Sequence, residues 1–329
     1  MITVKTKILK MLKEADGYVS GQDICEELHV SRTAVWKVIK QLQEEGYQIE
    51  AVRNKGYCLE KSADVITKAE LSSCMDSQWM GKNLVYYDET DSTNTRAKAL
   101  AEQGAPSGTL VVADCQMSGK GRRGRSWVSP RFANIYMTLI LKPQISPSCA
   151  SMLTLTAAMA VLAGIKEVTG LETEIKWPND LVYGGKKVCG ILTEMSAELD
   201  CIHYVVIGMG INVNLTEIAE EVAKTATSLR IESGRPVSRS ALIAAVIRWF
   251  EVYYQKFLET EDLSLLMEEY NEKLANQGRE VRVLAPSGDY CAVSRGINKS
   301  GELLVELEDG TLQKVVSGEV SVRGIYGYV

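Results

Sequence analysis

The sequence predicts an α+β protein of several domains, and three differences along the chain lead to this prediction. Residues 1–60 contain three amphipathic helical patterns and then a short β-hairpin. From Thr67 to about residue 275, strand and helix patterns alternate irregularly. Beyond Gln277, short strands with tight turns replace the helices. At 329 residues the chain is long enough for three domains, which we place at 1–62, 66–275 and 276–329.

The first region has the pattern of a winged helix-turn-helix. Its expected helices cover Lys5–Lys13, Gly21–Leu28 and Ser31–Glu45. Ser20 and Ser31 are the expected N-caps of the second and third helices. Only His29 and Val30 join these two helices, which requires a sharp turn. Two short alternating runs around Asn54-Lys55-Gly56 then predict a hairpin with a basic tip.

The third helix is the element expected to read DNA. Its apolar stripe leaves polar and basic side chains on the opposite face, where a helix in the major groove contacts bases and phosphates. The predicted DNA contacts on this helix and on the hairpin are Ser31, Arg32, Thr33, Trp36, Lys37, Lys40, Arg53 and Lys55. Residues 1–60 hold nine basic and nine acidic residues, so a winged helix that serves only as a protein adaptor is the alternative.

The composition excludes several classes of protein. The two histidines, His29 and His203, exclude a histidine-based triad and a His-rich metal site. The eight cysteines form no C-x-x-C pair, so neither a zinc ribbon nor a disulfide framework is expected. No apolar run approaches a membrane span and the N-terminus lacks a signal-peptide pattern, so we expect a cytoplasmic protein without a membrane partner. The net charge of −5 argues against nonspecific binding of nucleic acid by the whole surface.

The central region alternates between strands and helices without a repeat. The expected strands cover 84–87, 109–114, 134–141, 174–176, 188–195 and 202–214. The expected helices begin at the Thr67 capping box, at Asp91 or Ser92 and at Pro147, and cover 239–258 and 263–274. Expected strands at 281–284, 303–307 and 312–316, with turns at Ser287-Gly288-Asp289 and Asp309-Gly310, predict a small SH3-like barrel.

One loop of the central region concentrates positive charge. Gly119–Arg125 holds four cations and three glycines, and no Asp or Glu occurs from Cys115 to Lys166. Such charges repel one another unless water screens them or a bound anion neutralises them. The glycines let the backbone approach a ligand closely. We interpret the loop as an anion-binding site, with a solvated basic loop as the alternative.

The loop does not fit the common nucleotide-binding motifs. Gly119, Gly121 and Gly124 match G-x-G-x-x-G, but a strand rather than a helix follows them. No Walker P-loop is present either. Arginine side chains would therefore have to supply the positive charge.

A second cluster ends the expected strand 174–176. Pro178 removes a ladder donor, so Lys176, Asn179 and Asp180 would project from the strand end. A carboxylate such as Asp180 suits Mg²⁺ held through water or phosphate, and the alternative is a surface turn with an ordinary ion pair. Together with the basic loop, and without a nucleophile beside an activating base, this cluster indicates nucleotidyl transfer to a carboxylate.

The combined motifs resemble those of the biotin protein ligases. The matching segments are Asp91–Asn94, Gly119–Arg125, Lys176–Asp180, Lys187 with Gly190, and Gly208–Asn212. With the winged helix and the small β domain, the resemblance covers nearly the whole chain and extends to the bifunctional bacterial ligases that also repress the biotin operon. It implies a central mixed sheet related to the class II aminoacyl-tRNA synthetases.

The resemblance also implies residue roles. Biotin would contact Ser92, Thr93, Asn94, Gln116, Gly119, Lys120, Gly121, Arg122, Lys187, Gly190 and Gly208. ATP and the adenylate would contact Arg122, Arg125, Trp127, Asn179, Asn212 and Arg323. Catalysis would rest on Arg122, Lys176, Asp180 and Lys187, with Asp180 also the metal residue. Many members have arginine where this chain has Lys120, which keeps the charge but lacks the bidentate fork.

The implied reaction uses ATP and Mg²⁺, with biotin as substrate and as precursor of the corepressor. Biotin's carboxylate would attack ATP to give biotinyl-5′-adenylate, and a lysine of a biotin carboxyl carrier domain of a carboxylase would then attack the adenylate. The glycine-rich loop would close over this intermediate. An adenylate-bound homodimer would place two winged helices on palindromic operator DNA.

Three other functions compete with this interpretation. A ligand-sensing repressor would need the pocket but not Lys176, Asp180 and Lys187 together. A lipoate ligase is the nearest enzymatic alternative. A nucleic-acid-modifying enzyme would extend basic charge onto the catalytic domain.

Overall fold

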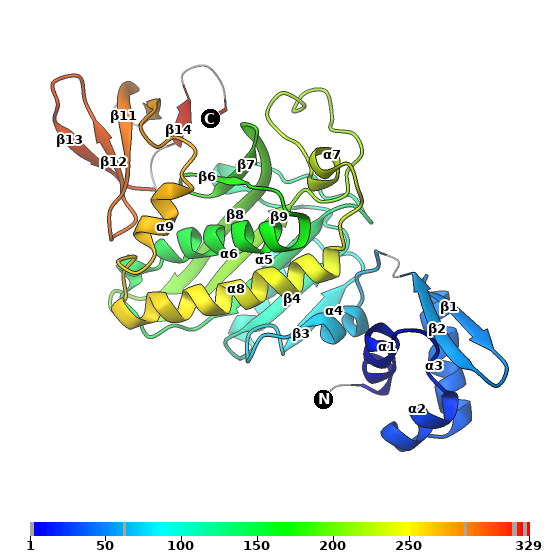
Figure 1. Cartoon of the computed structure of the whole chain (residues 1–329). Helices are drawn as coiled ribbons and strands as arrows, with labels where there is room; N and C mark the ends of the chain where they lie inside the picture. Colours follow the sequence, from blue (N-terminus) through cyan, green and yellow to red (C-terminus); the bar gives the residue numbers. More distant parts are fainter. Residues whose placement is uncertain (1–2, 62–63, 286–287, 318–320, 325–327) are drawn as a thin grey trace. The chain divides into compact units, whose positions relative to one another are not determined.

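The computed structural model describes residues 3–61, 64–285, 288–317, 321–324 and 328–329 (Figure 1). The chain divides into two compact units. One comprises Met1–Asp76 with Ser238–Ala244, and the other comprises Ser77–Val237 with Ala245–Val329. The predicted class, with a winged helix, a mixed sheet and a C-terminal β domain, is confirmed. The domain boundaries proposed from the sequence stay predictions.

The first unit contains the winged helix-turn-helix. Its elements are α1 (Val4–Glu14), α2 (Gly21–Leu28), α3 (Arg32–Glu44), the antiparallel pair β1 (Gln48–Val52) and β2 (Gly56–Lys61), α4 (Lys68–Cys74) and the start of α8 (Arg239–Thr260). Ser20 and Ser31 cap α2 and α3 as predicted, because their hydroxyls accept hydrogen bonds from the first-turn amides. The apolar stripes of the three helices meet in a core that includes Ile8, Ile24 and Ile39.

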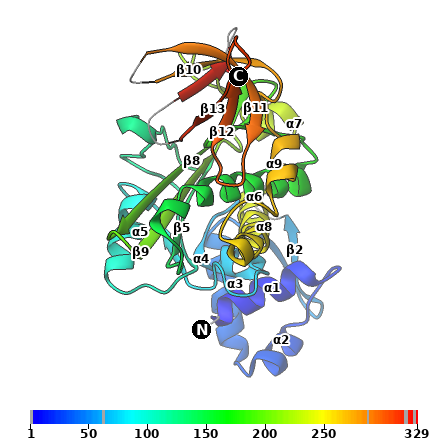
Figure 2. The same ribbon diagram turned by 90° about the vertical axis from the view of Figure 1, so that its left-hand side faces the viewer.

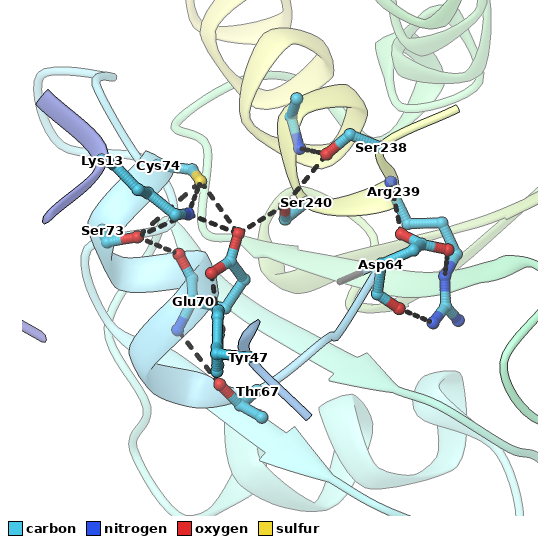
Figure 3. A network of polar contacts seen from close by, with 11 residues as sticks. Lys13, Tyr47, Asp64, Thr67, Glu70, Ser73, Cys74, Ser238, Arg239 and Ser240 are labelled. Carbon is cyan, nitrogen blue, oxygen red and sulfur yellow. Dashed lines mark hydrogen bonds and ion pairs between the residues drawn. The ribbon is translucent and has the colours of Figure 1, made fainter. Parts of the chain in front are cut away.

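A buried carboxylate joins α4 to the winged helix (Figure 3). The Thr67 hydroxyl accepts a hydrogen bond from the Glu70 amide at 3.1 Å, which is one half of the predicted capping box. The Glu70 carboxylate is engaged by other partners: it accepts from Lys13 Nζ and the Tyr47 hydroxyl, each at 2.5 Å, and from the Ser240 hydroxyl at 2.8 Å. Burial and the charge of Glu70 raise the pKa of Tyr47 far above its usual range, so this phenol remains a donor.

An acid also lies at the first residue of α8. Asp64 accepts from the Arg239 amide at 2.9 Å and from Arg239 Nε at 2.7 Å, and the Arg239 side chain is fully buried. A carboxylate at a helix N-terminus satisfies an amide donor and interacts favourably with the helix dipole. The start of α8 is therefore tied to the connection that follows β2 (Figure 3).

The second unit is built on a seven-stranded sheet. Its strand order is β3 (Leu84–Tyr87), β4 (Thr109–Ala113), β5 (Ile135–Leu141), β9 (Ile202–Ile211), β8 (Lys186–Ala197), β7 (Asp180–Tyr183) and β6 (Glu174–Lys176). Only the β3–β4 pair is parallel among these neighbours. The sheet is thus mixed, as expected, but β7 was not predicted, because Pro178 was interpreted as ending the strand rather than preceding a tight hairpin back to it.

Helices α5 (Thr93–Glu102) and α6 (Met152–Thr169) cover opposite faces of this sheet (Figure 2). Consecutive residues of a strand point to opposite faces. In β8, Glu194 pairs with Lys98 of α5 at 2.8 Å, whereas the neighbouring Thr193 accepts a hydrogen bond from Thr154 of α6 at 2.7 Å. The start of α5 is therefore held against one face of the sheet.

The span Pro147–Thr169 corrects one expectation from the sequence. By length and apolar composition it could cross a membrane, so the statement that no such run exists was wrong. It consists of a 3₁₀ turn at Pro147–Cys149 and then α6, and 72% of its most apolar window is buried inside the protein. Burial against the sheet accounts for its composition.

The C-terminal part of the second unit is a five-stranded antiparallel sheet. Its order is β13 (Leu312–Val315), β12 (Leu303–Glu306), β11 (Tyr290–Ile297), β10 (Glu280–Leu284) and β14 (Ser321–Gly324). The Asp309-Gly310 hairpin is confirmed, β11 and β14 were not predicted, and Ser287 lies outside the described residues. Two short helices precede this sheet, α7 (Leu229–Ser233), which was missed, and α9 (Met267–Glu272), which is shorter than the expected 263–274.

Candidate functional site

A cavity of about 50 Å³ lies in the second unit beside the start of α5. Many residues predicted to bind biotin or nucleotide line it: Ser92, Thr93, Asn94, Gln116, Lys120, Gly121, Arg122, Trp127, Asn179, Lys187, Gly190 and Gly208. The sequence analysis gave no binding role to six others: Tyr136, Met137, Ile191, Leu192, Met209 and Gly210. All six lie in strands; Met209 and Gly210 fall within the matching segment Gly208–Asn212, and the other four have the pattern of ordinary buried residues.

Glycines of β8 and β9 form part of the cavity lining. The side chains of Asn94 and Trp127 lie where a Cβ on these glycines would be. Gly190 pairs with Gly210 across β8 and β9, and Gly208 lies in the same strand as Gly210. A Cβ on Gly208 would lie 2.1 Å from Asn94 Oδ1, and one on Gly210 would lie 2.7 Å from the Trp127 ring. These separations are far below van der Waals contact, so any side chain here would displace a site residue.

The polar residues of the lining at the start of α5 are already hydrogen-bonded. Gln116 Oε1 accepts from the Thr93 amide at 2.9 Å. Asn94 Nδ2 donates to Glu194 Oε2 at 2.8 Å, and the Thr138 hydroxyl lies 2.7 Å from Asn94 Oδ1. Because both ends of the Asn94 amide are engaged, this side chain is held in one orientation at the start of α5.

The basic loop folds as a small closed hairpin. The Gly121 amide donates to the Arg125 carbonyl at 2.7 Å, and the Trp127 amide donates to the Gly119 carbonyl at 2.9 Å. Between them, Arg122–Gly124 forms a 3₁₀ turn in which Arg123 and Gly124 have positive φ angles of 56° and 70°. The third glycine thus supplies a left-handed turn residue.

Arg122 is the cation of the loop that faces the cavity most directly. Its Nη1 donates to Asn179 Oδ1 and its Nη2 donates to the Ser317 carbonyl, each at 2.6 Å. Burial lowers the pKa of Arg122 below its usual value, although Asp180 counteracts part of this. Lys120 Nζ donates to the Thr95 hydroxyl at 3.0 Å, while Arg125 is exposed. The loop therefore presents one partly buried guanidinium to the cavity, and its outer cations face solvent.

Trp127 lines the cavity beside the glycines. Its ring lies against Gly190 and Gly210, and Lys187 Nζ lies 5.1 Å from the ring centroid. Its Nε1 is buried without a hydrogen-bond partner among the residues that the structure describes. Small-molecule sites usually enclose about 300–1,000 Å³. The cavity is therefore smaller than such a site when the Trp127 ring lies against these glycines.

The second predicted cluster is buried rather than exposed. Lys187 Nζ pairs with Asp180 Oδ1 at 2.6 Å, and Asn179 Nδ2 donates to the same oxygen at 3.0 Å. The Tyr328 hydroxyl donates to Asp180 Oδ2. Asp180 and Lys176 are 7% and 6% exposed, so the alternative of a surface turn with an ordinary ion pair does not hold.

Some predicted site residues lie outside the cavity lining. Gly119, Arg125, Lys176, Asp180 and Asn212 do so. The Asn212 amide is turned to the Thr227 carbonyl at 3.1 Å. The backbone of Arg323 belongs to β14, and its side chain lies outside the part of the chain that the structure describes.

The predicted DNA contacts share an exposed surface of the first unit. Every one of the eight residues is exposed, Trp36 to 50%. Arg32, Arg53 and Lys55 line a groove of about 390 Å³ between the start of α2, α3 and the hairpin. Lys40 Nζ lies 4.8 Å from the centroid of the Trp36 ring. The basic side chains thus gather although the domain has no net charge.

A group of potential metal ligands occurs at the turn between β8 and β9. Donor atoms of Glu198, Cys201 and His203 lie within 4.8 Å of one another. All three side chains are exposed, and the cavity lining includes none of them. This group is separate from the site described above.

Three family models match successive parts of the chain. An HTH domain matches residues 4–58, the biotin/lipoate A/B protein ligase family matches residues 86–212, and the biotin protein ligase C-terminal domain matches residues 278–323. The second match spans the segments that line the cavity between β3 and β9.

Whole-chain relatives and a solved structure resemble the chain over most of its length. The bifunctional ligase/repressor BirA of Bacillus subtilis is 39% identical over 97% of this chain and 99% of its own length. The protein of the same name from Escherichia coli is 30% identical over 98% of each chain. A biotin protein ligase from Aquifex aeolicus, solved with biotin and ATP, is 32% identical, with a TM-score of 0.67 over 74% of this chain and 99% of its own.

Proposed function

The chain belongs to the biotin protein ligase family, in its bifunctional ligase/repressor group, and from this premise we propose how its site works. It is an ATP-dependent biotin ligase that forms biotinyl-5′-adenylate, transfers the biotinyl group to a carboxylase, and represses transcription. The assignment of catalytic and binding roles to residues rests on one observation. Arg122, Lys187 and Asn179 line the same cavity as the paired glycines of β8 and β9.

In the first half-reaction an oxygen of biotin's carboxylate attacks the α-phosphorus of ATP. The new carboxylate–phosphorus bond forms as the bond to the bridging oxygen breaks, and pyrophosphate leaves with that electron pair. Two anions must approach each other, so fixed cations contribute by offsetting their repulsion. Arg122 and Lys187 are the cations that line the cavity close to the Asn179–Asp180 segment.

Lys187 changes partner in this scheme. In the structure it pairs with Asp180 Oδ1 at 2.6 Å, and the pair is largely buried. The carboxylate of biotin offers Lys187 an equivalent anion inside the cavity. Binding would therefore draw the ammonium from Asp180 to the substrate and leave Asp180 Oδ1 bound to Asn179 Nδ2.

The donor atoms beside the cavity fit Mg²⁺. This ion prefers hard oxygen ligands and is commonly held by one or two carboxylates together with substrate phosphates. Asp180 supplies one buried carboxylate, and the Asn179 carbonyl oxygen lies next to it, where Arg122 now donates to it at 2.6 Å. When bound there, Mg²⁺ would neutralise charge on the phosphates of ATP.

The second half-reaction joins biotin to a lysine. The neutral amine of a lysine in a biotin carboxyl carrier domain attacks the carbonyl carbon of the adenylate, and AMP leaves as the amide forms. Water attacks the same bond, so the intermediate must be shielded. We propose that the Gly119–Arg125 loop closes over the adenylate and that Trp127 leaves the cavity to lie against adenine. Limited proteolysis at the exposed Arg123 and Arg125 should slow when the adenylate forms.

Repression uses the exposed basic surface of the winged helix. Operator DNA is the partner of this surface, and we propose a palindromic site bound by an adenylate-dependent homodimer in the cytoplasm. A coupling of about 1–3 kcal/mol between adenylate binding and dimerisation is enough for a useful response. Sedimentation with and without biotin and ATP tests this step, and an unchanged monomer fraction would remove dimerisation from the scheme.

The experiment that tests the enzymatic function is exchange of labelled pyrophosphate into ATP. Exchange should depend on biotin, because pyrophosphate returns to ATP only through the adenylate. A ligand-sensing repressor without catalysis would show no exchange. The family model also includes lipoate ligases, so lipoate serves as the competing acid. Exchange supported by lipoate and not by biotin would overturn the choice of substrate.

A further inference from the structure

The C-terminal residues reach the catalytic cluster through one tyrosine. Tyr328 lies 148 positions after Asp180, and its hydroxyl donates a hydrogen bond to Asp180 Oδ2. Its ring also lies under an ammonium group, because Lys176 Nζ is 4.1 Å from the ring centroid. One side chain therefore contacts both charged residues of the Lys176–Asp180 motif.

These two contacts meet on one hairpin. Lys176 ends β6 and Asp180 begins β7, and their Cα atoms are paired across the turn. Both side chains are buried. A hydrogen bond to an ionised carboxylate and a cation lying on an aromatic face are both strong when they are shielded from water. Tyr328 thus contacts the carboxylate through its hydroxyl and the ammonium through the face of its ring.

We propose that Tyr328 is a positioning residue for the nucleotide half of the site, an inference that rests on the proposed function. Lys187 and Tyr328 now bind different oxygens of Asp180. When biotin draws Lys187 away, Tyr328 and Asn179 keep the carboxylate directed toward the phosphates of ATP. The same ring keeps the Lys176 ammonium beside that carboxylate. Lys176, Asp180 and Tyr328 all lie outside the lining of the cavity proposed to hold biotin.

The C-terminal sheet has a second contact at the same place. The Ser317 carbonyl accepts from Arg122 Nη2 at 2.6 Å, and Gly301 accepts from the Trp177 indole at 3.1 Å. Gly301 thus contacts the Lys176–Asp180 motif directly, whereas Ser317 contacts Arg122, which donates to Asn179 of that motif. Of these three contacts, only the hydrogen bond from Tyr328 reaches the carboxylate of Asp180.

Two substitutions separate the hydroxyl from the ring. Tyr328→Phe removes only the hydrogen bond to Asp180, and Tyr328→Ala also removes the surface under Lys176. Tyr290→Phe is the control, since it makes the same change of side chain at a residue of β11 in the C-terminal sheet, outside the cavity lining. Thermal unfolding of Tyr328→Phe and of Tyr290→Phe should stay close to that of the unchanged protein, because each substitution removes one hydroxyl and keeps the ring.

The first measurement is equilibrium binding of α,β-methylene-ATP with Mg²⁺, followed by calorimetry. Tyr328→Phe should raise Kd about tenfold, the change that corresponds to one charge-assisted hydrogen bond. Tyr328→Ala should raise it further, and Tyr290→Phe should leave it unchanged. Binding by Tyr328→Phe that equals or exceeds that of the unchanged protein would overturn the proposal.

The second measurement is pyrophosphate exchange at varied ATP and varied biotin. Tyr328→Phe should raise KM for ATP about tenfold and leave KM for biotin within twofold. Equal changes in both constants would show a general structural role and would also overturn the proposal. Absence of biotin-dependent exchange in the unchanged protein would refute the proposed function instead, and the calorimetric comparison would still decide the role of Tyr328.

Discussion

Two buried carboxylates, one in each compact unit, use similar partners for different purposes. Glu70 pairs with Lys13 at 2.5 Å and Asp180 pairs with Lys187 at 2.6 Å, and a tyrosine hydroxyl donates to each acid. The partners of Glu70 come from the core of its folded unit (Figure 3), whereas Lys187 lines a cavity. A buried ion pair therefore marks an active site only where one partner can exchange with a ligand.

The largest expected effect is on the stability of the first unit. Glu70→Ala leaves Lys13, the Tyr47 hydroxyl and the Ser240 hydroxyl without their buried acceptor. Removing one member of a buried pair costs about 3–5 kcal/mol. Denaturant unfolding should show this loss, while biotin-dependent exchange at low temperature stays within twofold.

The control for this substitution is Glu14→Ala. Glu14 pairs with Lys10 at 3.6 Å on the surface, where both side chains are mostly exposed. Such a pair is worth about 0–1 kcal/mol, so unfolding should barely change. Unchanged stability of Glu70→Ala, or loss of exchange in a fully stable Glu70→Ala protein, would break the comparison.

The next largest effect is on catalysis. Lys187→Ala removes the ammonium proposed to receive biotin's carboxylate, and exchange should fall about 100-fold or more, as when one group that stabilises developing charge is lost. Lys186→Ala is the control, because Lys186 is the exposed neighbour in β8. Exchange by Lys187→Ala within threefold of the unchanged protein would show that Lys187 is a structural partner of Asp180, like Lys13 of Glu70.

A smaller effect is expected on retention of the intermediate. Arg122→Gly removes the hydrogen bonds to Asn179 and to the Ser317 carbonyl but should leave folding intact. Release of preformed biotinyl-adenylate, measured by filter binding, should become about tenfold faster, as expected if Arg122 gives one charged hydrogen bond to the adenylate. Arg123→Gly, at an exposed position with positive φ, should retain the adenylate normally. Equal release by the two variants would remove Arg122 from this role.

The smallest effect is spectroscopic. If Trp127 leaves the cavity when the adenylate forms, the fluorescence emission of its indole should change. The change should disappear in Trp127→Phe and persist in Trp79→Phe, whose tryptophan does not line the cavity. An identical change in both variants would show that another tryptophan reports the transition.

Local patterns allowed the sequence to predict much of the fold. Ser20, Ser31 and Thr67 cap helices as expected, and Asp309-Gly310 forms a hairpin, because these structures depend on residues close in the chain. The missed strands β7, β11 and β14 are short or end at turns with weak signals. Their pairing depends on distant partners, which periodicity does not reveal.

The candidate site shows the same limit. The basic loop, Lys187 and the glycines were found because charge and glycine spacing are visible in the sequence. The contacts of Ser317 and Tyr328 with Arg122 and Asp180 were missed, because nothing near either residue marks it as part of a site. Glu70 was assigned to a capping box, yet its carboxylate faces Lys13, which lies 57 residues earlier.

The most direct test of the account identifies what the protein holds after incubation with biotin, ATP and Mg²⁺. Rapid gel filtration, followed by denaturation and mass spectrometry, should recover one biotinyl-5′-adenylate per chain, and Lys187→Ala should recover little. Recovery of unreacted biotin and ATP alone from the unchanged protein would contradict the claim that this cavity joins the two.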